Sequence, residues 1–141
     1  MPRLLFGAAD GEGIVIDLPE RAQGRDGWFD ARVEVKVSGF VGSISAYFEI
    51  DDFVKFRKSL ISLYQTLAGT ADLSHRERQV ALSLRGNGRG AIEVRGFAYA
   101  HPTHGSKLDF EFKIDQTFLA EPIRVLDRFM EVHGRADVPA A

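Results

Sequence analysis

Most of this 141-residue sequence alternates between apolar and polar residues, and that alternation is the strongest constraint on its fold. Successive side chains of a β-strand point to opposite faces, so an alternating segment has one face to bury and one to expose. Most connections between such segments are too short for parallel crossovers, so the sequence predicts an antiparallel sheet. Six segments have the pattern, and "RLLFGA" near the start can add to them, which gives about six to eight strands. The six are residues 13–18, 28–38, 42–50, 79–85, 90–100 and 106–115.

Two other segments have the period of a helix. From Asp51, and again from Thr117 as far as Gly134, apolar residues recur at spacings of three and four. An aspartate of the pair Asp51 and Asp52 is placed to cap the first helix and Gly69 to end it, and Pro122 is compatible with the first turn of the second. Each helix has a single apolar stripe, which requires a packing surface. The predicted fold is therefore α+β, an antiparallel β-sheet with both helices packed on it.

The length of the chain corresponds to a single domain with one core. We expect this α+β domain to span residues 1–134, with residues 135–141 as a flexible C-terminal tail. Residues 19–27 are rich in polar residues and glycine, and we expect them to form a surface loop.

The two halves of the domain resemble each other. "VKVSGF" (35–40) matches "IEVRGF" (92–97), and Phe53 in the first helix matches Phe118 in the second at a separation of 118 − 53 = 65 positions. Each half then consists of two strands followed by a helix, as an internal duplication would produce. Two unrelated strand-strand-helix units would share the same periodicities, so the sequence leaves both interpretations open.

The composition argues against several classes of function. Eighteen basic and 20 acidic residues give a formal net charge of −2, which disfavours binding of nucleic acid through a general basic face. The absence of cysteine excludes disulfides, thiolate metal sites and cysteine nucleophiles. His101 and His104 share a loop without the further ligands of a zinc site, so no metal or other cofactor is expected. No segment resembles a signal sequence or a membrane span, so we expect a cytoplasmic location and no membrane partner.

The segment "RGNGRG" (85–90) has two interpretations. Its amides and arginines could cradle a phosphate, or it could turn one strand into the next. Known phosphate loops lead into a helix, whereas a predicted strand follows here. We therefore predict a hairpin, with Asn87 and Gly88 as the central pair of a two-residue type I′ turn, in which both residues have positive φ.

The adjacent segment "RGFAY" (95–99) matches the first five positions of the ribonucleoprotein motif of RNA-recognition domains, whose aromatic residues stack on bases. Later positions, normally aliphatic and aromatic, are Ala100 and Pro102, and another strand follows instead of a helix. A bulge at Gly96 would return the aromatic residues to the buried face. Nucleic acid is therefore not the partner that we expect.

No group of residues resembles an active site. Ser43 and Ser45 lie in a predicted strand without the surroundings of a nucleophilic serine. Helix capping explains the adjacent Asp51 and Asp52. The sequence therefore favours a non-catalytic binding protein.

The order of the predicted elements resembles that of a known family. A loop is followed by the strand "WFDARVEVKV", a hairpin strand, the helix "DDFVKFRKSLISLYQTL", the strands "VALSLRGNG", "AIEVRGFAYA" and "LDFEFKID", and a terminal helix. Over roughly residues 10–134, this order resembles the WapI-like family of bacterial immunity proteins. The resemblance implies a cytoplasmic domain that binds a protein partner, its cognate toxin, and neutralises it by occlusion without turnover.

In such a protein, the contact surface would be the face or edge of the sheet that the helices leave uncovered. The candidates are polar residues that alternate with the core, together with the single tryptophan, because tryptophan is a frequent interface anchor. Of the neighbours Trp28 and Phe29, we expect one in the core and one exposed. The predicted partner-binding residues are Trp28, Glu34, Lys36, Glu93, Arg95, Asp109, Glu111 and Lys113.

An alternative hypothesis comes from another class of function. A cleft between the sheet and the helices, lined by Phe and Tyr side chains, would make the protein a small-molecule or peptide-binding module. The sequence leaves the ligand and the oligomeric state open, and it does not decide whether the halves form one sheet or two.

Overall fold

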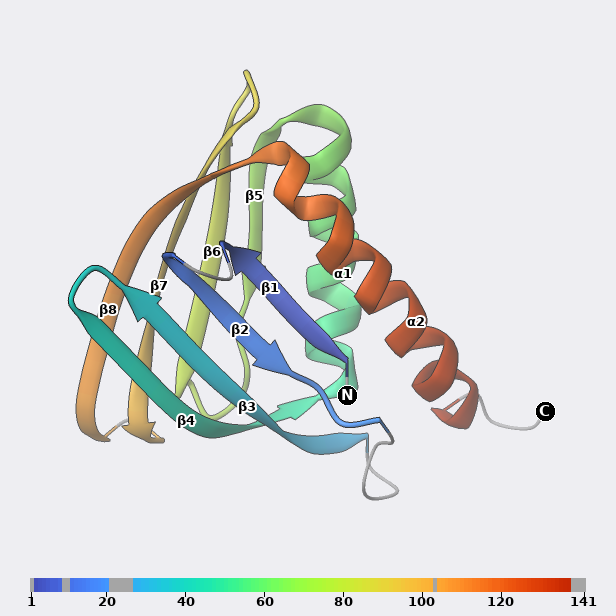
Figure 1. Ribbon diagram of the computed structural model, residues 1–141. Coiled ribbons are helices and arrows are strands. Elements are labelled where there is room, and N and C mark those ends of the chain that lie inside the picture. Colours follow the sequence, from blue (N-terminus) through green and yellow to red (C-terminus); the bar gives the residue numbers. More distant parts are fainter. Residues whose placement is uncertain (1, 9–10, 21–26, 103, 138–141) are drawn as a thin grey trace.

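Eight strands and two helices make up the described part of the chain (Figure 1). The computed structural model describes residues 2–8, 11–20, 27–102 and 104–137. Most of the predicted loop at 19–27 and the last residues of the predicted tail lie outside these ranges. All strand pairings between the described residues are antiparallel, so the predicted α+β fold with an antiparallel sheet and two helices is confirmed.

The strands form two four-stranded sheets instead of one continuous sheet. The order in the first sheet is β1 (Arg3–Gly7), β2 (Gly13–Asp17), β3 (Trp28–Val37) and β4 (Phe40–Glu49). The order in the second sheet is β5 (Ala68–Leu73), β6 (Val80–Asn87), β7 (Ala91–His101) and β8 (His104–Asp115). Helix α1 (Ile50–Thr66) follows the first sheet. The 3₁₀ turn η1 (Gln116–Leu119) and helix α2 (Ala120–Asp137) follow the second.

Each helix packs beside the edge of the sheet formed by the other half of the chain (Figure 1). Helix α1 lies beside β5, α2 lies beside β1, and the helices contact each other. At the opposite end, β3 and β4 approach β8 and β7. The sheets and helices therefore enclose one shared core. Its six fully buried phenylalanines are Phe6, Phe29, Phe48, Phe53, Phe56 and Phe129.

Helix α1 begins and ends at residues other than those predicted. The helix starts at Ile50, and the predicted capping by an aspartate is confirmed at Asp52, whose carboxylate accepts a hydrogen bond of 2.8 Å from the backbone N–H of Glu49, the residue before the helix. The left-handed residue that ends the helix is Leu67, with φ of 63°, whereas Gly69 lies in β5. Residue type alone does not fix a helix end to within one or two positions, because pairing of the next strand also decides where the chain must turn.

Helix α2 agrees with its prediction more closely. Pro122 lies in its first turn, and the carboxylate of Asp115 accepts a hydrogen bond of 2.9 Å from the backbone N–H of Thr117 at the start of η1. That hydrogen bond holds the pKa of the Asp115 carboxyl below its ordinary value. The helix continues past Gly134 to Asp137. Within the described ranges, no helix is long and apolar enough to span a membrane.

The repeated unit is larger than predicted, because each half contains four strands and a helix. Buried helix positions correspond at a separation of 66, as for Phe53 and Leu119 (119 − 53 = 66). The predicted separation of 65 is wrong because it places Phe118 in the core, and that side chain is 46% exposed. The match between "VKVSGF" and "IEVRGF" also fails, since the first spans the β3–β4 turn and the second lies inside β7.

Candidate protein-binding surface

The predicted partner-binding residues lie on two faces instead of one. Helix α1 separates β4 from β5 along the chain, so each half pairs only within its own sheet. Three of the predicted residues point outward from the first sheet: Trp28, Glu34 and Lys36. The other five point outward from the second sheet: Glu93, Arg95, Asp109, Glu111 and Lys113.

Three of the five residues on the second sheet, Glu93, Arg95 and Glu111, form a set of connected ion pairs. The register of β7 and β8 places Arg95 opposite Glu111 and Glu93 opposite Lys113. Arg95 Nη2 lies 3.2 Å from Glu111 Oε1, and Arg95 Nε contacts the Glu93 carboxylate. Exposed pairs of this kind contribute little to stability, so these side chains can exchange partners at low cost when another charged surface approaches.

The aromatic residues of "RGFAY" also lie on this outer face, and the predicted bulge at Gly96 is wrong. Phe97 and Tyr99 remain partly exposed, and the irregularity in strand pairing lies further along, between Tyr99 and His101. The ring of Phe110 packs against the inward side of Gly96, and this packing explains why no bulge forms there. A side chain at Gly96 would lie 2.6 Å from Cζ of Phe110, whose ring occupies the inward space. Gly96 therefore takes an inward position without a bulge.

The rings of Phe97 and Tyr99 are already in contact with other groups. They pack edge to face with centroids 5.5 Å apart, and Lys107 Nζ lies 4.8 Å from the Phe97 centroid and 5.4 Å from that of Tyr99. The same ammonium is 3.3 Å from Asp109 Oδ1. A base would have to displace this lysine and approach a carboxylate. The surroundings of the motif therefore disfavour RNA binding.

A hollow of about 700 Å³ lies on the outer face of the second sheet. Its floor consists of small residues, Ala81 and Ser83 on β6 and Gly96 on β7, and Phe97 forms part of its wall. The charged residues that line it are Asp72, Arg95, Asp109 and Glu111. Arg95 pairs with Glu111 and Lys107 pairs with Asp109, whereas Asp72 has no ion pair among the described residues. The hollow is therefore complementary to a basic side chain of a partner.

Sequence reasoning missed Asp72 and the hollow. The segment "AGTADL" forms β5, but alanine and glycine are weak strand formers and its polar–apolar alternation is short. The available signal was the alternation at its end, where Ala71 and Leu73 are buried and Asp72 is exposed. The hollow itself arises from small residues that meet across neighbouring strands, and only the strand register reveals such neighbours.

Comparison with known families gives one match, to the "Immunity protein WapI-like family", over residues 4–133. The chain belongs to this family. No curated protein matches the sequence. The matched residues include both sheets and most of α2, so the family assignment applies to the whole fold and to both outer faces.

On the first sheet of this WapI-like immunity protein, Trp28 is the most prominent of the predicted contact residues. Its ring stacks on that of Tyr47 with centroids 5.2 Å apart, and the guanidinium of Arg76 lies 5.8 Å from the ring. Phe29 is in the core and 1% exposed, as predicted for one of the pair, whereas Trp28 is half-buried and not fully exposed.

The "RGNGRG" segment of this WapI-like protein connects β6 to β7, so the predicted hairpin is confirmed and a strand follows the loop. The prediction of a two-residue type I′ turn is wrong. Asn87 Oδ1 accepts hydrogen bonds from the backbone N–H groups of Arg89 at 2.7 Å and Ala91 at 3.2 Å. Positive φ occurs at Gly88 and Gly90 instead of at Asn87. The asparagine side chain thus organises a longer loop.

The histidine pair of the WapI-like protein lies at the tip of the β7–β8 hairpin. The rings of His101 and His104 stack with centroids 5.0 Å apart, and both residues are exposed. Across the residues that the structure describes, no group of three or more His, Cys, Asp or Glu is placed to hold a metal ion.

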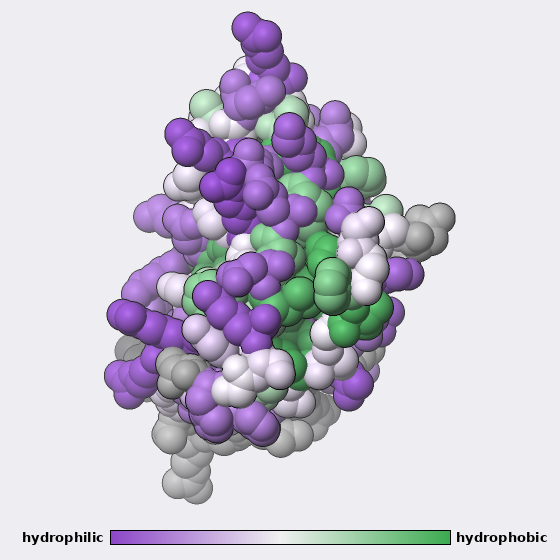
Figure 2. All heavy atoms as spheres, turned by 90° about the vertical axis from the view of Figure 1, so that its left-hand side faces the viewer, coloured by the Kyte–Doolittle hydropathy of each residue, from purple (hydrophilic) through white to green (hydrophobic). Residues whose placement is uncertain are grey.

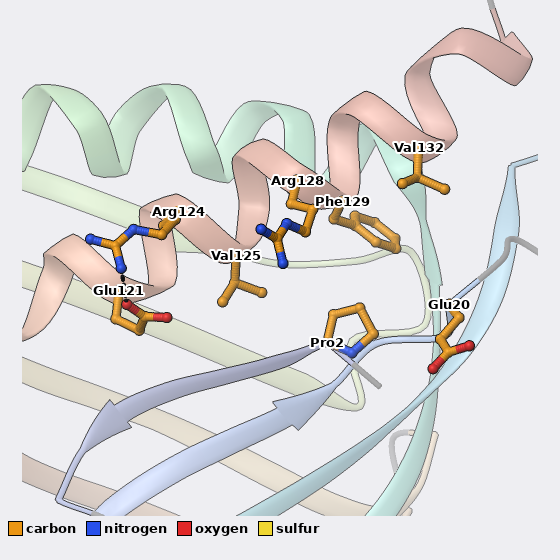
Figure 3. Close-up of a pocket in the computed structure, with 8 residues that line it drawn as sticks. All are labelled: Pro2, Glu20, Glu121, Arg124, Val125, Arg128, Phe129 and Val132. Carbon is orange, nitrogen blue, oxygen red and sulfur yellow. Dashed lines mark hydrogen bonds and ion pairs between the residues drawn. The ribbon is translucent and has the colours of Figure 1, made fainter.

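A cleft of about 420 Å³ lies between α2 and the start of β1 (Figure 3). Val125 and Phe129 point from α2 toward Pro2, and Arg124 Nη1 pairs with Glu121 at 2.9 Å. This differs from the predicted ligand cleft with Phe and Tyr walls, because most of the phenylalanines between the sheets and helices fill the core of the WapI-like fold.

Proposed function

We propose that this protein neutralises a cognate bacterial toxin by binding to it and occluding its functional surface, without turnover. The match to the WapI-like immunity family over residues 4–133 carries the proposal. A protein of this kind acts stoichiometrically, so it needs a preformed complementary surface and no catalytic group. We place this action in the cytoplasm of the bacterium that makes the toxin.

The outer face of the second sheet is the contact surface that we propose. The hollow there has carboxylates from Asp72, Asp109 and Glu111 and a guanidinium from Arg95. This excess of negative charge supports a basic partner surface, such as the substrate groove of a toxin that acts on nucleic acid. Basic side chains of the toxin would enter the hollow and exchange with the internal ion pairs of the face.

A toxin domain encoded directly upstream of this gene would be the candidate partner, and mixing it with the purified protein tests this proposal. We expect an equimolar complex by size-exclusion chromatography with light scattering, and a dissociation constant of about 10 nM or tighter by calorimetry. Toxin activity should fall in proportion to the amount of protein added, up to one equivalent. Complete loss of toxin activity at a small fraction of an equivalent would indicate catalytic inactivation and contradict occlusion. Absence of a complex would overturn the proposed function.

A further inference from the structure

The free edge of β4 has outward-facing backbone groups. A two-residue turn joins Val37 to Phe40, so these residues form the first hydrogen-bonded pair of the β3–β4 ladder. Hydrogen-bonded and non-hydrogen-bonded pairs alternate along an antiparallel ladder. The backbone N–H and C=O groups that point away from β3 therefore belong to Val41, Ser43 and Ser45, and to the odd-numbered residues that follow.

The protein covers one half of this edge with its own side chains. The carbonyl oxygens of Ser45 and Tyr47 accept hydrogen bonds from Gln79 Nε2 at 3.0 Å and His75 Nδ1 at 2.8 Å. Closer to the turn, the outward-facing backbone groups of Val41 and Ser43 have no hydrogen-bond partner among the described residues. We call Val41–Ser43 the free edge. An uncovered strand edge is a template for pairing with another strand.

An apolar wedge of about 320 Å³ opens beside the free edge, between the ends of the two sheets. Phe40 and Val41, which line it, are 65% and 68% exposed. Figure 2 shows this side of the molecule, with an apolar area bordered by polar side chains. Other apolar side chains that line the wedge are Val35, Ile44, Ala100 and Leu108.

We propose that an extended segment of the toxin pairs with the free edge of β4 and inserts an apolar side chain into the wedge. Strand addition supplies backbone hydrogen bonds, and the pocket beside the edge selects the side chain. The inference rests on the proposed function and specifies how the toxin is held. Lys107 lines the wedge and contacts Phe97, which lines the hollow, so one partner can cover both sites.

The position of the wedge favours the toxin over a second copy of this chain as its occupant. The Lys107 ammonium lies on the outer side of the second sheet, where it contacts Phe97, Tyr99 and Asp109 Oδ1. Because Lys107 also lines the wedge, the free edge adjoins the outer surface that we propose for the toxin. A partner bound to that surface reaches the edge without a second interface, whereas a second copy would need a separate one.

A proline at Ser43 tests strand addition directly. Ser43 makes no backbone hydrogen bond to β3, since its pair with Glu34 is non-hydrogen-bonded, and proline is tolerated at such edge positions. Ser43→Pro removes the outward N–H and places a ring in the path of the added strand, whereas Ser43→Ala leaves the N–H intact. We expect Ser43→Pro to bind the upstream toxin domain at least about tenfold more weakly and Ser43→Ala to bind as the wild type does.

Amide hydrogen exchange provides a second measurement that does not depend on a variant. In the complex, the N–H groups of Val41 and Ser43 should become protected, while that of Gly42, already bonded to β3, should change little. Protection that appears in the free protein and rises with its concentration, together with a dimer by light scattering, would assign the edge to a second copy and overturn the inference.

The two proposals fail in different ways. If the wild type binds and inhibits the toxin domain, but Ser43→Pro binds equally well and the exchange of Val41 and Ser43 is unchanged, only strand addition is wrong. If the wild type does not bind the toxin domain at all, the proposed function is wrong. Circular dichroism and thermal unfolding of Ser43→Pro establish that a loss of binding is not a loss of folding.

Discussion

The imidazole of His75 joins the two sheets. Its Nδ1 lies 2.8 Å from the carbonyl oxygen of Tyr47 on β4, and its Nε2 accepts hydrogen bonds from the backbone N–H groups of Gln79 at 3.1 Å and Val80 at 2.9 Å. These contacts require the neutral tautomer with its proton on Nδ1. The residue is 5% exposed and its ring packs on Phe48 with centroids 4.5 Å apart. If the imidazole were removed, water could not readily replace its hydrogen bonds.

Replacing His75 should therefore be costly. We expect His75→Ala to lower the free energy of unfolding by about 2–4 kcal/mol, because it leaves a cavity and three backbone groups without partners. Urea denaturation measures the change. His101→Ala, at an exposed histidine, is the matched control and should change stability by less than about 0.5 kcal/mol. Equal effects of the two substitutions would contradict the structural role of His75.

The inward-facing position of Gly96 should not accept a side chain. A Cβ there would clash with the carbonyl oxygen of Ala81 and lie 2.6 Å from Cζ of Phe110. We expect Gly96→Ala to lower the free energy of unfolding by about 1–3 kcal/mol. At Gly42 the nearest atom to an added Cβ is Leu108 Cδ2 at 3.4 Å, so Gly42→Ala is the control and should be much less destabilising. Denaturation of both variants distinguishes a close packing position from a general preference for glycine in strands.

Charge reversal in the hollow should weaken toxin binding. Asp72→Lys changes an exposed carboxylate that lines the hollow, and Asp30→Lys makes the same change on the outer face of the first sheet. We expect a loss of affinity of about tenfold or more for Asp72→Lys and little change for Asp30→Lys. Calorimetry at two salt concentrations checks the electrostatic origin, because salt should reduce the difference between wild type and Asp72→Lys. The opposite ranking of the variants would move the contact surface to the first sheet.

Asp52 should make stability depend on pH in the direction opposite to most carboxylates. Partial burial raises the pKa of its carboxyl, and this outweighs the hydrogen bond from the Glu49 N–H. With a raised folded-state pKa, the stabilising contribution is fully present below the ordinary value, about 3.9, and is lost as pH rises through the folded value. Asp52→Asn can keep an acceptor for that N–H without the charge. Its stability relative to wild type should therefore be higher at neutral pH than near pH 3, as measured by urea unfolding at both.

The sequence predicted the elements in which buried and exposed positions alternate with a regular period. The alternation from Trp28 to Val37 predicted β3, and the apolar stripe from Phe53 predicted α1 with its buried face. Features that depend on contacts between residues of neighbouring strands could not be predicted from these periods. The inward position of Gly96 depends on the Phe110 ring of the next strand, and the acidic hollow depends on Asp72 in a strand with weak propensity.

The division of the candidate contact residues between two faces was missed for a related reason. Alternation predicts which side chains of a strand share a face, but it does not say with which sheet that strand pairs. Trp28 and Arg95 both point away from the core, yet they lie on different sheets because α1 interrupts the pairing between halves. Strand pairing between β4 and β5 would have placed all of these residues on one continuous face, and the sequence left open which of the two arrangements occurs.

The placement of α2 against β1 has a consequence for how the molecule is made. These elements lie at opposite ends of the described chain, and α2 covers a sheet edge that was synthesised more than a hundred residues earlier (Figure 1). Until residues 120–137 have left the ribosome, the first sheet lacks its cover and the core lacks Phe129. An incomplete nascent chain therefore lacks a finished core, and under the proposed function protection would begin only when translation of this last helix is complete.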